Sequence, residues 1–421
     1  MNGLVKNKEH NMKTLPFTLT LCAALVSSVA TASDADLQQR VSALEAELAK
    51  LKTKPVLTKV DGGLRAQTAD GSSKFRFAGR LQADYAFYDK DVKDLGSGSE
   101  LRTLRLGSRG TLAPNWDYKM EADFTTGGTV RVTEGYVAYT GLQNATIQIG
   151  NIFEMYGLEE YSSSVDTTFM ERSVAVDAFV PDYNQGIAYL RWGDAYSFSA
   201  GLYGNSTNDA ASAVNESAGT SARLVFAPLH STGDVISVGL SSYWRDVTSD
   251  TWRVRARPNS HVTPIRLIDT GAINDVNTAT AVALEASMTK GAFSVQAEYN
   301  QQMLNRNHGK KDADFKGWYI YGSYVLTGES RVWDMPSATY SRPSPKNAGG
   351  AWEVALRFDQ LDLDDTGAAI SGGEMQTTTL GLNWYPVNNV RFSANAIQVS
   401  SKKAGAEDNP NILQMRAQVA F

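Results

Sequence analysis

The stretch NILQMRAQVAF, residues 411–421, decides which fold this sequence predicts. Its odd-numbered side chains from Leu413 to Phe421 are apolar, whereas the even-numbered ones are mostly polar, with Gln414 and Arg416 among them. A strand that faces hydrocarbon on one side and water on the other keeps this alternation up to its last residue. The end of a soluble domain usually frays into polar residues instead. The stretch therefore predicts a strand of a membrane barrel that ends on an aromatic side chain.

The same alternation recurs in segment after segment from Lys74 onward. FRFAGRLQADYAFY (75–88) and WDYKMEADF (116–124) each place apolar side chains on one face and mostly polar ones on the other. An apolar face on every strand is typical of a transmembrane barrel and not of a soluble sandwich. We therefore predict an all-β fold, an antiparallel barrel of sixteen strands. The predicted strands lie near 74–89, 100–113, 116–126, 129–140, 144–152, 185–192, 195–204, 220–228, 234–246, 279–290, 291–302, 314–327, 349–363, 375–386, 389–401 and 410–421.

The composition supports many short strands. The 421 residues include 35 Gly, 18 Tyr, 15 Phe and 8 Trp, as expected for tight turns and aromatic anchors. A barrel is one closed sheet that grows with the number of strands, so the chain length does not indicate the number of domains. No run of about 18 apolar residues follows the N-terminal segment, which excludes a helical membrane protein. The net charge of −5 excludes a global basic field, so a preference for anions must come from where the arginines lie.

The first residues resemble a secretion signal. We expect residues 1–32 to be the signal segment, with translation beginning effectively at Met12. From there the stretch contains one lysine, a short apolar run and a cleavage pattern from Ala30 to Ala32. Removal of this segment also removes Cys22, the one cysteine of the chain. The mature chain is therefore expected to contain no disulfide and no thiol chemistry.

Residues 33–54 carry a heptad pattern. The apolar residues follow one another at spacings of four and three, which predicts a short coiled-coil helix; they are Leu37, Val41, Leu44, Leu48 and Leu51. The segment is too short to be stable alone, so we expect an oligomer held together elsewhere. An amphipathic helix that lies on its own protein is the alternative. We expect residues 55–73 to be a linker and residues 74–421 to form the barrel.

Four segments resemble the phosphate-selective porin O and P family in their order and spacing. They are GNIFEMYGLEEYSSSVDTTFMERS (150–173), WRVRARPNSHVTPIRLIDTG (252–271), YVLTGESRVW (324–333) and GAWEVALRFDQLDL (350–363). The resemblance implies a homotrimeric channel of sixteen strands in the outer membrane of a Gram-negative cell. It also implies that two outer loops (153–184 and 247–278) and one long periplasmic turn (328–348) fold inward. By resemblance to outer-membrane proteins in general, Phe421 is expected to be read by the barrel-assembly machinery.

Arginines are the candidate residues for an anion pathway. In an extended segment Arg253, Arg255 and Arg257 point the same way at intervals of about 6.5–7 Å, and a planar guanidinium donates to two oxyanion oxygens together. The resemblance assigns these three to an arginine ladder and places Arg80 and Arg105 at family-like positions. The strand candidates are Arg76, Arg80, Arg105, Arg109 and Arg131. The alternative is that these arginines pair across the lumen with Asp84, Asp117, Glu121, Asp123 and Glu134, as in unselective porins.

The predicted constriction loop departs from the family pattern. Phe153 stands where phosphate-specific members carry lysine, and Asn259 replaces a family glutamate after Pro258. Glu154 and Arg172 complete our candidate constriction residues. Passage of phosphate or polyphosphate-like anions and passage of small solutes in general therefore both stay open, with Lys119, Lys316 or Arg172 as alternative cations.

Other functions find less support in the sequence. The three histidines outside the signal segment, His230, His261 and His308, fall in predicted turns and loops and not beside a serine on a strand face. We therefore expect no enzyme, and we expect no cofactor, metal site or nucleic-acid partner. A barrel that the coiled coil tethers to the cell wall is a structural alternative. The expected partners are small inorganic anions, outer-membrane lipid and two further copies of the chain.

Overall fold

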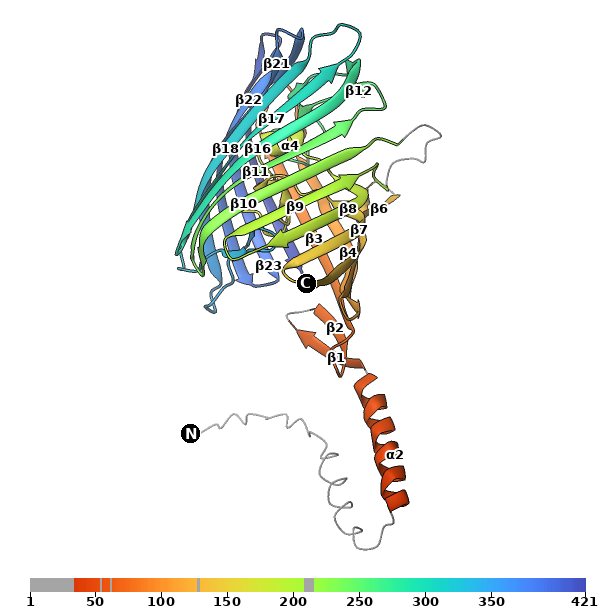
Figure 1. Cartoon of the computed structure of the whole chain (residues 1–421). Helices are drawn as coiled ribbons and strands as arrows, with labels where there is room; N and C mark the ends of the chain where they lie inside the picture. Colours follow the sequence, from red (N-terminus) through yellow and green to blue (C-terminus); the bar gives the residue numbers. More distant parts are fainter. Residues whose placement is uncertain (1–33, 54, 61–62, 127–128, 208–215) are drawn as a thin grey trace, which may run out of the picture. The chain divides into compact units, whose positions relative to one another are not determined.

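Sixteen strands form a closed antiparallel barrel in the described part of a computed structural model of the chain (Figure 1). The structure describes residues 34–53, 55–60, 63–126, 129–207 and 216–421. The strands are β3 (Lys74–Tyr88), β4 (Gly98–Ala113), β5 (Trp116–Thr126), β6 (Thr129–Leu142), β7 (Ala145–Phe153), β8 (Tyr183–Trp192), β9 (Tyr196–Tyr203), β10 (Gly219–Ser231), β11 (Asp234–Asp246), β16 (Val276–Lys290), β17 (Phe293–Arg306), β18 (Ala313–Val325), β21 (Ala351–Asp365), β22 (Ile370–Val387), β23 (Val390–Lys403) and β25 (Asn411–Ala420). This confirms the predicted fold class, and every predicted strand is found with its ends shifted by a few residues.

The C-terminal stretch closes the barrel. β25 pairs with β3 in a register that sets Arg416 opposite Asp84. Beyond the strand, Phe421 exchanges two backbone hydrogen bonds with Gly79, at 3.0 and 3.1 Å. A Cβ on Gly79 would lie 2.6 Å from the Phe421 ring, so glycine lets the two strands approach at this point. The alternation that predicted a barrel thus forms its closing pair of strands.

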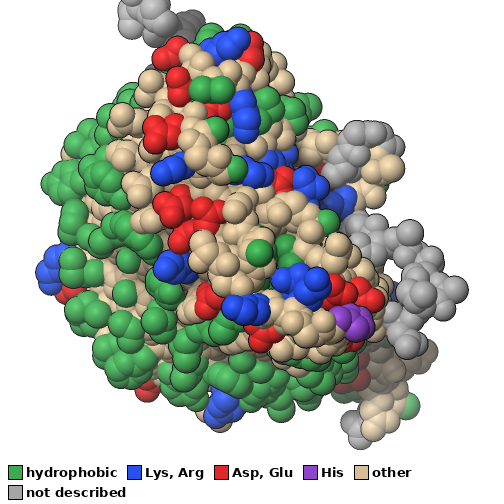
Figure 2. Space-filling model, turned by 90° about the horizontal axis from the view of Figure 1, so that it is seen from above, with side chains coloured by type: hydrophobic (Ala, Val, Ile, Leu, Met, Phe, Trp, Pro, Cys, Tyr) green, Lys and Arg blue, Asp and Glu red, His purple; other side chains and the backbone are tan. Residues whose placement is uncertain are grey.

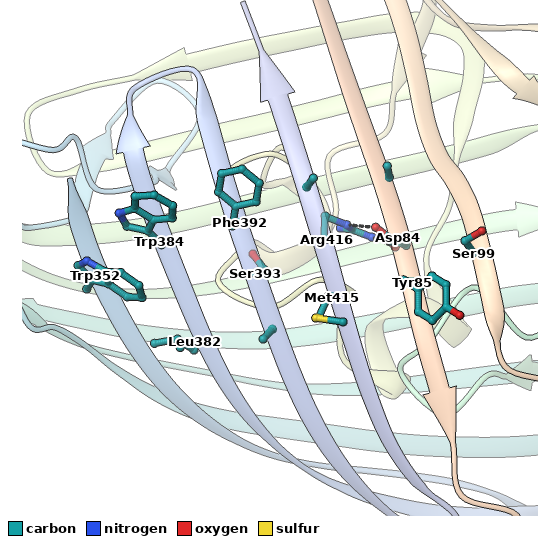
Figure 3. A pocket seen from close by; sticks show the side chains of 13 residues that line it. Asp84, Tyr85, Ser99, Trp352, Leu382, Trp384, Phe392, Ser393, Met415 and Arg416 are labelled. Carbon is teal, nitrogen blue, oxygen red and sulfur yellow. Dashed lines mark hydrogen bonds and ion pairs between the residues drawn. The ribbon is translucent and has the colours of Figure 1, made fainter. Parts of the chain in front are cut away.

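The two faces of the barrel wall differ as the alternation predicts. On β25 the residue Met415 is 44% exposed, whereas the residue Arg416 as a whole is 3% exposed. Figure 3 shows apolar side chains of successive strands side by side, with the stacked rings of Trp352, Trp384 and Phe392 among them. They line an apolar depression of about 560 Å³ in the wall. Such a surface is suited to hydrocarbon.

The chain before the barrel forms helix α2 (Asp34–Thr53) and strands β1 (Pro55–Val60) and β2 (Gly63–Thr68). The stretch expected to be a linker thus contains two strands, of which β2 pairs with the start of β3. The described chain falls into two compact units, one with the helix and one with the barrel. In the described residues, no helix is long and apolar enough to cross a membrane. The predicted signal segment lies outside the described residues.

Short turns lie at one end of the barrel and longer loops at the other. Loop L3 (residues 154–182) contains α3 (Leu158–Tyr161) and α4 (Val174–Phe179). The short elements of loop L5 (residues 247–275) are β12 (Thr251–Trp252), β13 (Arg255–Ala256), β14 (Ile268–Asp269) and β15 (Ile273–Asn274). At the short-turn end, the long turn (residues 326–350) contains β19 (Val332–Asp334) and β20 (Thr339–Ser341), and β24 (Ala406–Asp408) lies in the last outer loop.

The apolar core lies inside the barrel because two loops fold into it. Val174 and Phe179 of L3 pack with Ile268 of L5 and with wall residues such as Phe315 and Leu361, all buried. Helix α4 contacts β13, β17, β18 and β21. L3 and L5 therefore narrow the lumen between them, as the resemblance implied.

Candidate functional site

Loop L3 is held to the barrel wall by a buried group of charges. Arg416 donates to Asp84 at 2.6 and 2.7 Å and to Glu171 of L3 at 2.7 Å. Arg102 donates to both oxygens of Glu171, at 3.0 and 3.1 Å. Burial acts to raise the pKa of Glu171, but Arg102 and Arg416 outweigh it and lower the pKa well below its ordinary value. The two arginines therefore favour the anionic form of Glu171, and their hydrogen bonds fix L3 to two strands.

The predicted constriction residues Glu154 and Arg172 also hold the loop in place. Glu154 is fully buried, forms an ion pair with Arg245 and accepts from Asn184 at 2.7 Å. Arg172 donates to three L3 carbonyls, those of Glu159, Glu160 and Ser162, at 2.9–3.1 Å. Phe153 packs on the rings of Tyr161 and Tyr183, with centroids 6.3 and 4.7 Å apart. An aromatic cluster thus stands where the resemblance implies a lysine in phosphate-specific members.

A water-accessible cavity of about 600 Å³ lies beside L3. Three predicted pathway arginines line it, and each has an acidic partner. Arg80 donates to Glu121 at 3.0 Å, Arg105 donates to Asp123 at 2.9 Å, and Arg131 pairs with Asp182. The remaining charged lining residues include Lys119, which pairs with Glu134. At this level the pathway arginines are therefore paired with acids, as in the alternative that the sequence left open. The partners lie on nearby strands of the same wall or on L3, however, and not across the lumen.

Seen from the end that carries the outer loops, basic and acidic side chains gather over the middle of the barrel within a hydrophobic rim (Figure 2). In L5 the three ladder candidates alternate with the buried Val254 and Ala256. Arg253 donates to Asp269 at 2.8 and 2.5 Å and is neutralised by it. Arg255 is exposed, and among the described residues no carboxylate forms an ion pair with it. Arg257 donates to the carbonyl of Thr263 at 2.9 Å.

Arg266 is a fourth arginine of L5 that the sequence reasoning missed. Strands β13 and β14 pair Arg255 with Asp269 and Ala256 with Ile268, so the returning chain brings Arg266 back toward Arg257. Burial first, and then the positive charge of Arg257, lower the pKa of Arg266 to about 10. Its Nε and Nη1 atoms are buried and have no hydrogen-bond partner among the described residues. Only the hairpin register reveals this proximity, and the sequence gives no signal of it.

A second cavity, of about 810 Å³, lies at the short-turn end of the barrel. Arg109 lines it and forms no ion pair with any carboxylate of the described residues. The other basic lining residues are Arg65, Lys74, Arg76 and Lys119, against Asp117 as the acidic one. Positive charge therefore prevails at this end of the lumen.

The long turn folds into the barrel and meets L3. Buried Arg223 is paired with Glu285 at 2.7 Å and donates to the carbonyls of Ser337 and Ala338, both at 2.8 Å. Arg342 donates to Asp166 of L3 at 2.9 Å. Because the turn and L3 are linked by an ion pair, the narrow part of the lumen is braced from both ends.

The three histidines and one cluster of carboxylates are the remaining candidate groups for catalysis or metal binding in the described part of the chain. His261 contacts Glu100 at 2.9 Å, His308 contacts Asp275 at 3.1 Å, and His230 contacts a backbone carbonyl at 2.9 Å. Among the described residues, one group of carboxylates could hold a cation, namely Asp362, Asp364 and Glu374, with ligand oxygens within 4.8 Å of one another. Two of these three side chains are exposed, as acidic groups without a metal commonly are.

Glu160 of L3 should make the passage depend on pH. Burial raises the pKa of Glu160 to about 8; Arg172, 2.9 Å away, lowers it, while Asp182 and Asp177 raise it. The carboxyl is neutral below this pKa and negative above it. We expect the ratio of anion to cation permeability to fall about two- to threefold as pH rises from 6 to 9. Zero-current potentials measured across this range check the prediction, and Glu160→Gln should remove the step. An equal step in that variant would contradict it.

Comparison with known proteins relates the chain to porins. The family described as phosphate-selective porin O and P matches residues 75–421. Porin O of Pseudomonas aeruginosa is 29% identical over 390 residues, which cover 83% of this chain and 88% of that protein. The anion-selective porin from Comamonas acidovorans has a similar structure, with a TM-score of 0.53 and 15% identity over 83% of this chain and 100% of that one. OmpT of Vibrio cholerae in its trimer form gives a TM-score of 0.53 and 12% identity over the same shares.

Proposed function

The chain belongs to the phosphate-selective porin O and P family, and on this premise we propose that it conducts small inorganic anions, phosphate or polyphosphate-like ones included. It is a porin of the outer membrane. We further propose that three copies form a homotrimer and that Phe421 is its signal for the barrel-assembly machinery. The homotrimer proposal is supported by the trimer form of OmpT, a similarly folded outer membrane protein of Vibrio cholerae.

The observation that carries the anion proposal is the group of L5 arginines without acidic partners. Arg255, Arg257 and Arg266 lie close enough to perturb one another, and no carboxylate forms an ion pair with them among the described residues. Like charges in a partly desolvated place repel one another. An anion that enters between these arginines reduces that electrostatic repulsion, which favours its binding. Guanidinium groups suit oxyanions because their planar N–H pairs match two oxygens.

The proposed path then runs from L5 past L3 to the cavity at the short-turn end. Beside L3, Arg80, Arg105 and Arg131 offer positive charge that acids balance, so an ion is held weakly there. At the far end Arg109 again lacks an acidic partner among the described residues. The proposed path is therefore positive at both ends and nearly neutral beside L3. Such a path attracts an anion without binding it tightly, so that the anion can also leave, as conduction requires.

Single-channel recording in planar bilayers tests the proposal. We expect zero-current potentials in a salt gradient to show anion selectivity, and we expect added phosphate to block chloride current. A large and weakly selective conductance that phosphate does not block would contradict the anion proposal. The barrel would then be a general small-solute porin, the function favoured by the acid pairing of Arg80, Arg105 and Arg131.

Phe153→Lys should strengthen phosphate binding. The ring lies near Tyr183, over which Arg105 and Arg131 also lie at 5.6 and 5.7 Å, so a lysine there would join two cations. We expect the phosphate concentration that halves the chloride current to fall about fivefold, which corresponds to about 1 kcal/mol. Phe153→Met serves as the control for lost packing. Equal block of the two variants would show that this position does not contribute to selectivity.

A further inference from the structure

Helix α2 presents an apolar seam that is open to solvent. Four heptad residues are exposed by 42–52%, namely Leu37, Val41, Leu44 and Leu48. An isolated helix of this length is marginal in water, and a seam of this kind is normally covered by a second helix. The helix therefore needs a partner that offers a matching apolar seam.

We propose that the partner is the same helix in other copies of this chain, in a parallel and in-register coiled coil. This inference rests on the proposed homotrimer but not on the proposed anion pathway. Copies in a closed ring of membrane barrels are all inserted in one direction, so the symmetry axis runs along the membrane normal. Helices related by such an axis run parallel to one another. A short coil becomes stable under these conditions because the barrels raise its effective concentration.

The charges beside the seam fit this arrangement. With Val41 and Leu48 at position a and Leu44 at position d, Arg40 occupies position g and Glu45 the next position e. In a parallel in-register coil, position g of one helix faces the following position e of its neighbour. Arg40 of one copy would therefore lie beside Glu45 of the next, so opposite charges meet at each contact. The sequence of α2 thus favours its own copy as a partner.

Disulfide cross-linking of the full protein in outer membranes tests the proposal. Leu44→Cys supplies the one thiol expected in the mature chain and places the cysteines of two copies face to face. We expect oxidation to join two of every three chains as a covalent dimer. Ala46→Cys, at the outward position f, is the matched control and should stay at least tenfold less cross-linked. Because both positions are on an exposed helix, neither variant should affect folding of the barrel.

Charge reversal supplies a second readout. Arg40→Glu should slow cross-linking through Leu44→Cys severalfold, and the further change Glu45→Arg should restore it. Absence of cross-linking in a barrel that still migrates as an unheated trimer would overturn the coiled coil alone and leave the helix on its own protein or on the cell wall. Monomeric migration would instead overturn the homotrimer. Equal cross-linking through Leu44→Cys and Ala46→Cys would likewise contradict a specific seam.

Discussion

Replacing Arg255, Arg257 and Arg266 together by glutamine is expected to remove most of the selectivity for anions. The zero-current potential in a salt gradient should move from the anion side to near zero. The phosphate concentration that halves the chloride current should rise about tenfold or more. This corresponds to a loss of about 0.5 kcal/mol or more for each partly exposed charge.

The reason is that three of the four L5 arginines form no ion pair within the described residues, although the charge of Asp177 favours the charged form of Arg257 and Arg266. Arg253 donates twice to Asp269, so its charge is already balanced. The other three L5 arginines form no ion pair with a carboxylate of the described residues. Their summed field therefore acts on ions in the lumen, whereas paired arginines contribute little beyond their own neighbours. Removing arginines that form no ion pair therefore changes the ion selectivity of the channel more than removing paired arginines.

A matched variant separates this local effect from a change of net charge. Lys310→Gln, Lys311→Gln and Lys402→Gln remove the same charge from exposed positions outside the L5 group. We expect that triple variant to conduct like the unmodified protein at moderate salt, because exposed surface charges are screened by water and salt. Equal losses in the two triple variants would show that selectivity comes from total charge, and the L5 site would then be discarded.

The strands could be predicted from the sequence because their pattern is local. The parity of Leu413 and Arg416 already separates the lipid side from the lumen side, and the structure places them so. Partners inside the lumen are not local. Arg416 meets Glu171 across 245 positions of sequence, and no periodicity connects them. The sequence could show that Arg416 faces inward but not which acid it holds.

The same limit applies to the site residues on the loops. Glu154 and Arg172 carry charge within the constriction loop, yet both charges bind the loop and the wall around it. Arg266 lies in an irregular part of L5, where neither strand nor helix periodicity predicts a neighbour. Its closeness to Arg257 follows from a two-residue ladder between β13 and β14. Pathway residues on loops therefore require the structure.

Arg416→Met should destabilise the barrel and widen the passage at the same time. The Arg416 side chain is 1% exposed and bridges Asp84 of the wall to Glu171 of L3. Its removal leaves Asp84 buried without its cation, a change that typically costs about 3–5 kcal/mol. Urea unfolding of the protein in lipid vesicles measures this cost. Within the described residues the Glu171 carboxylate then keeps the ion pair with Arg102 alone, so we also expect larger and noisier single-channel conductance.

Two companion variants make this result decisive. Lys290→Met breaks an ion pair with Asp234 in which the lysine is 71% exposed, and it should leave stability almost unchanged. Adding Asp84→Leu to Arg416→Met removes the stranded charge, so part of the lost stability should return while L3 stays loose. The double variant would then regain stability but keep the altered conductance. Stability depends on the unpaired buried carboxylate of Asp84, whereas conductance depends on the anchor of L3. If Arg416→Met behaved like Lys290→Met, the buried charges would not be what holds L3 against the wall.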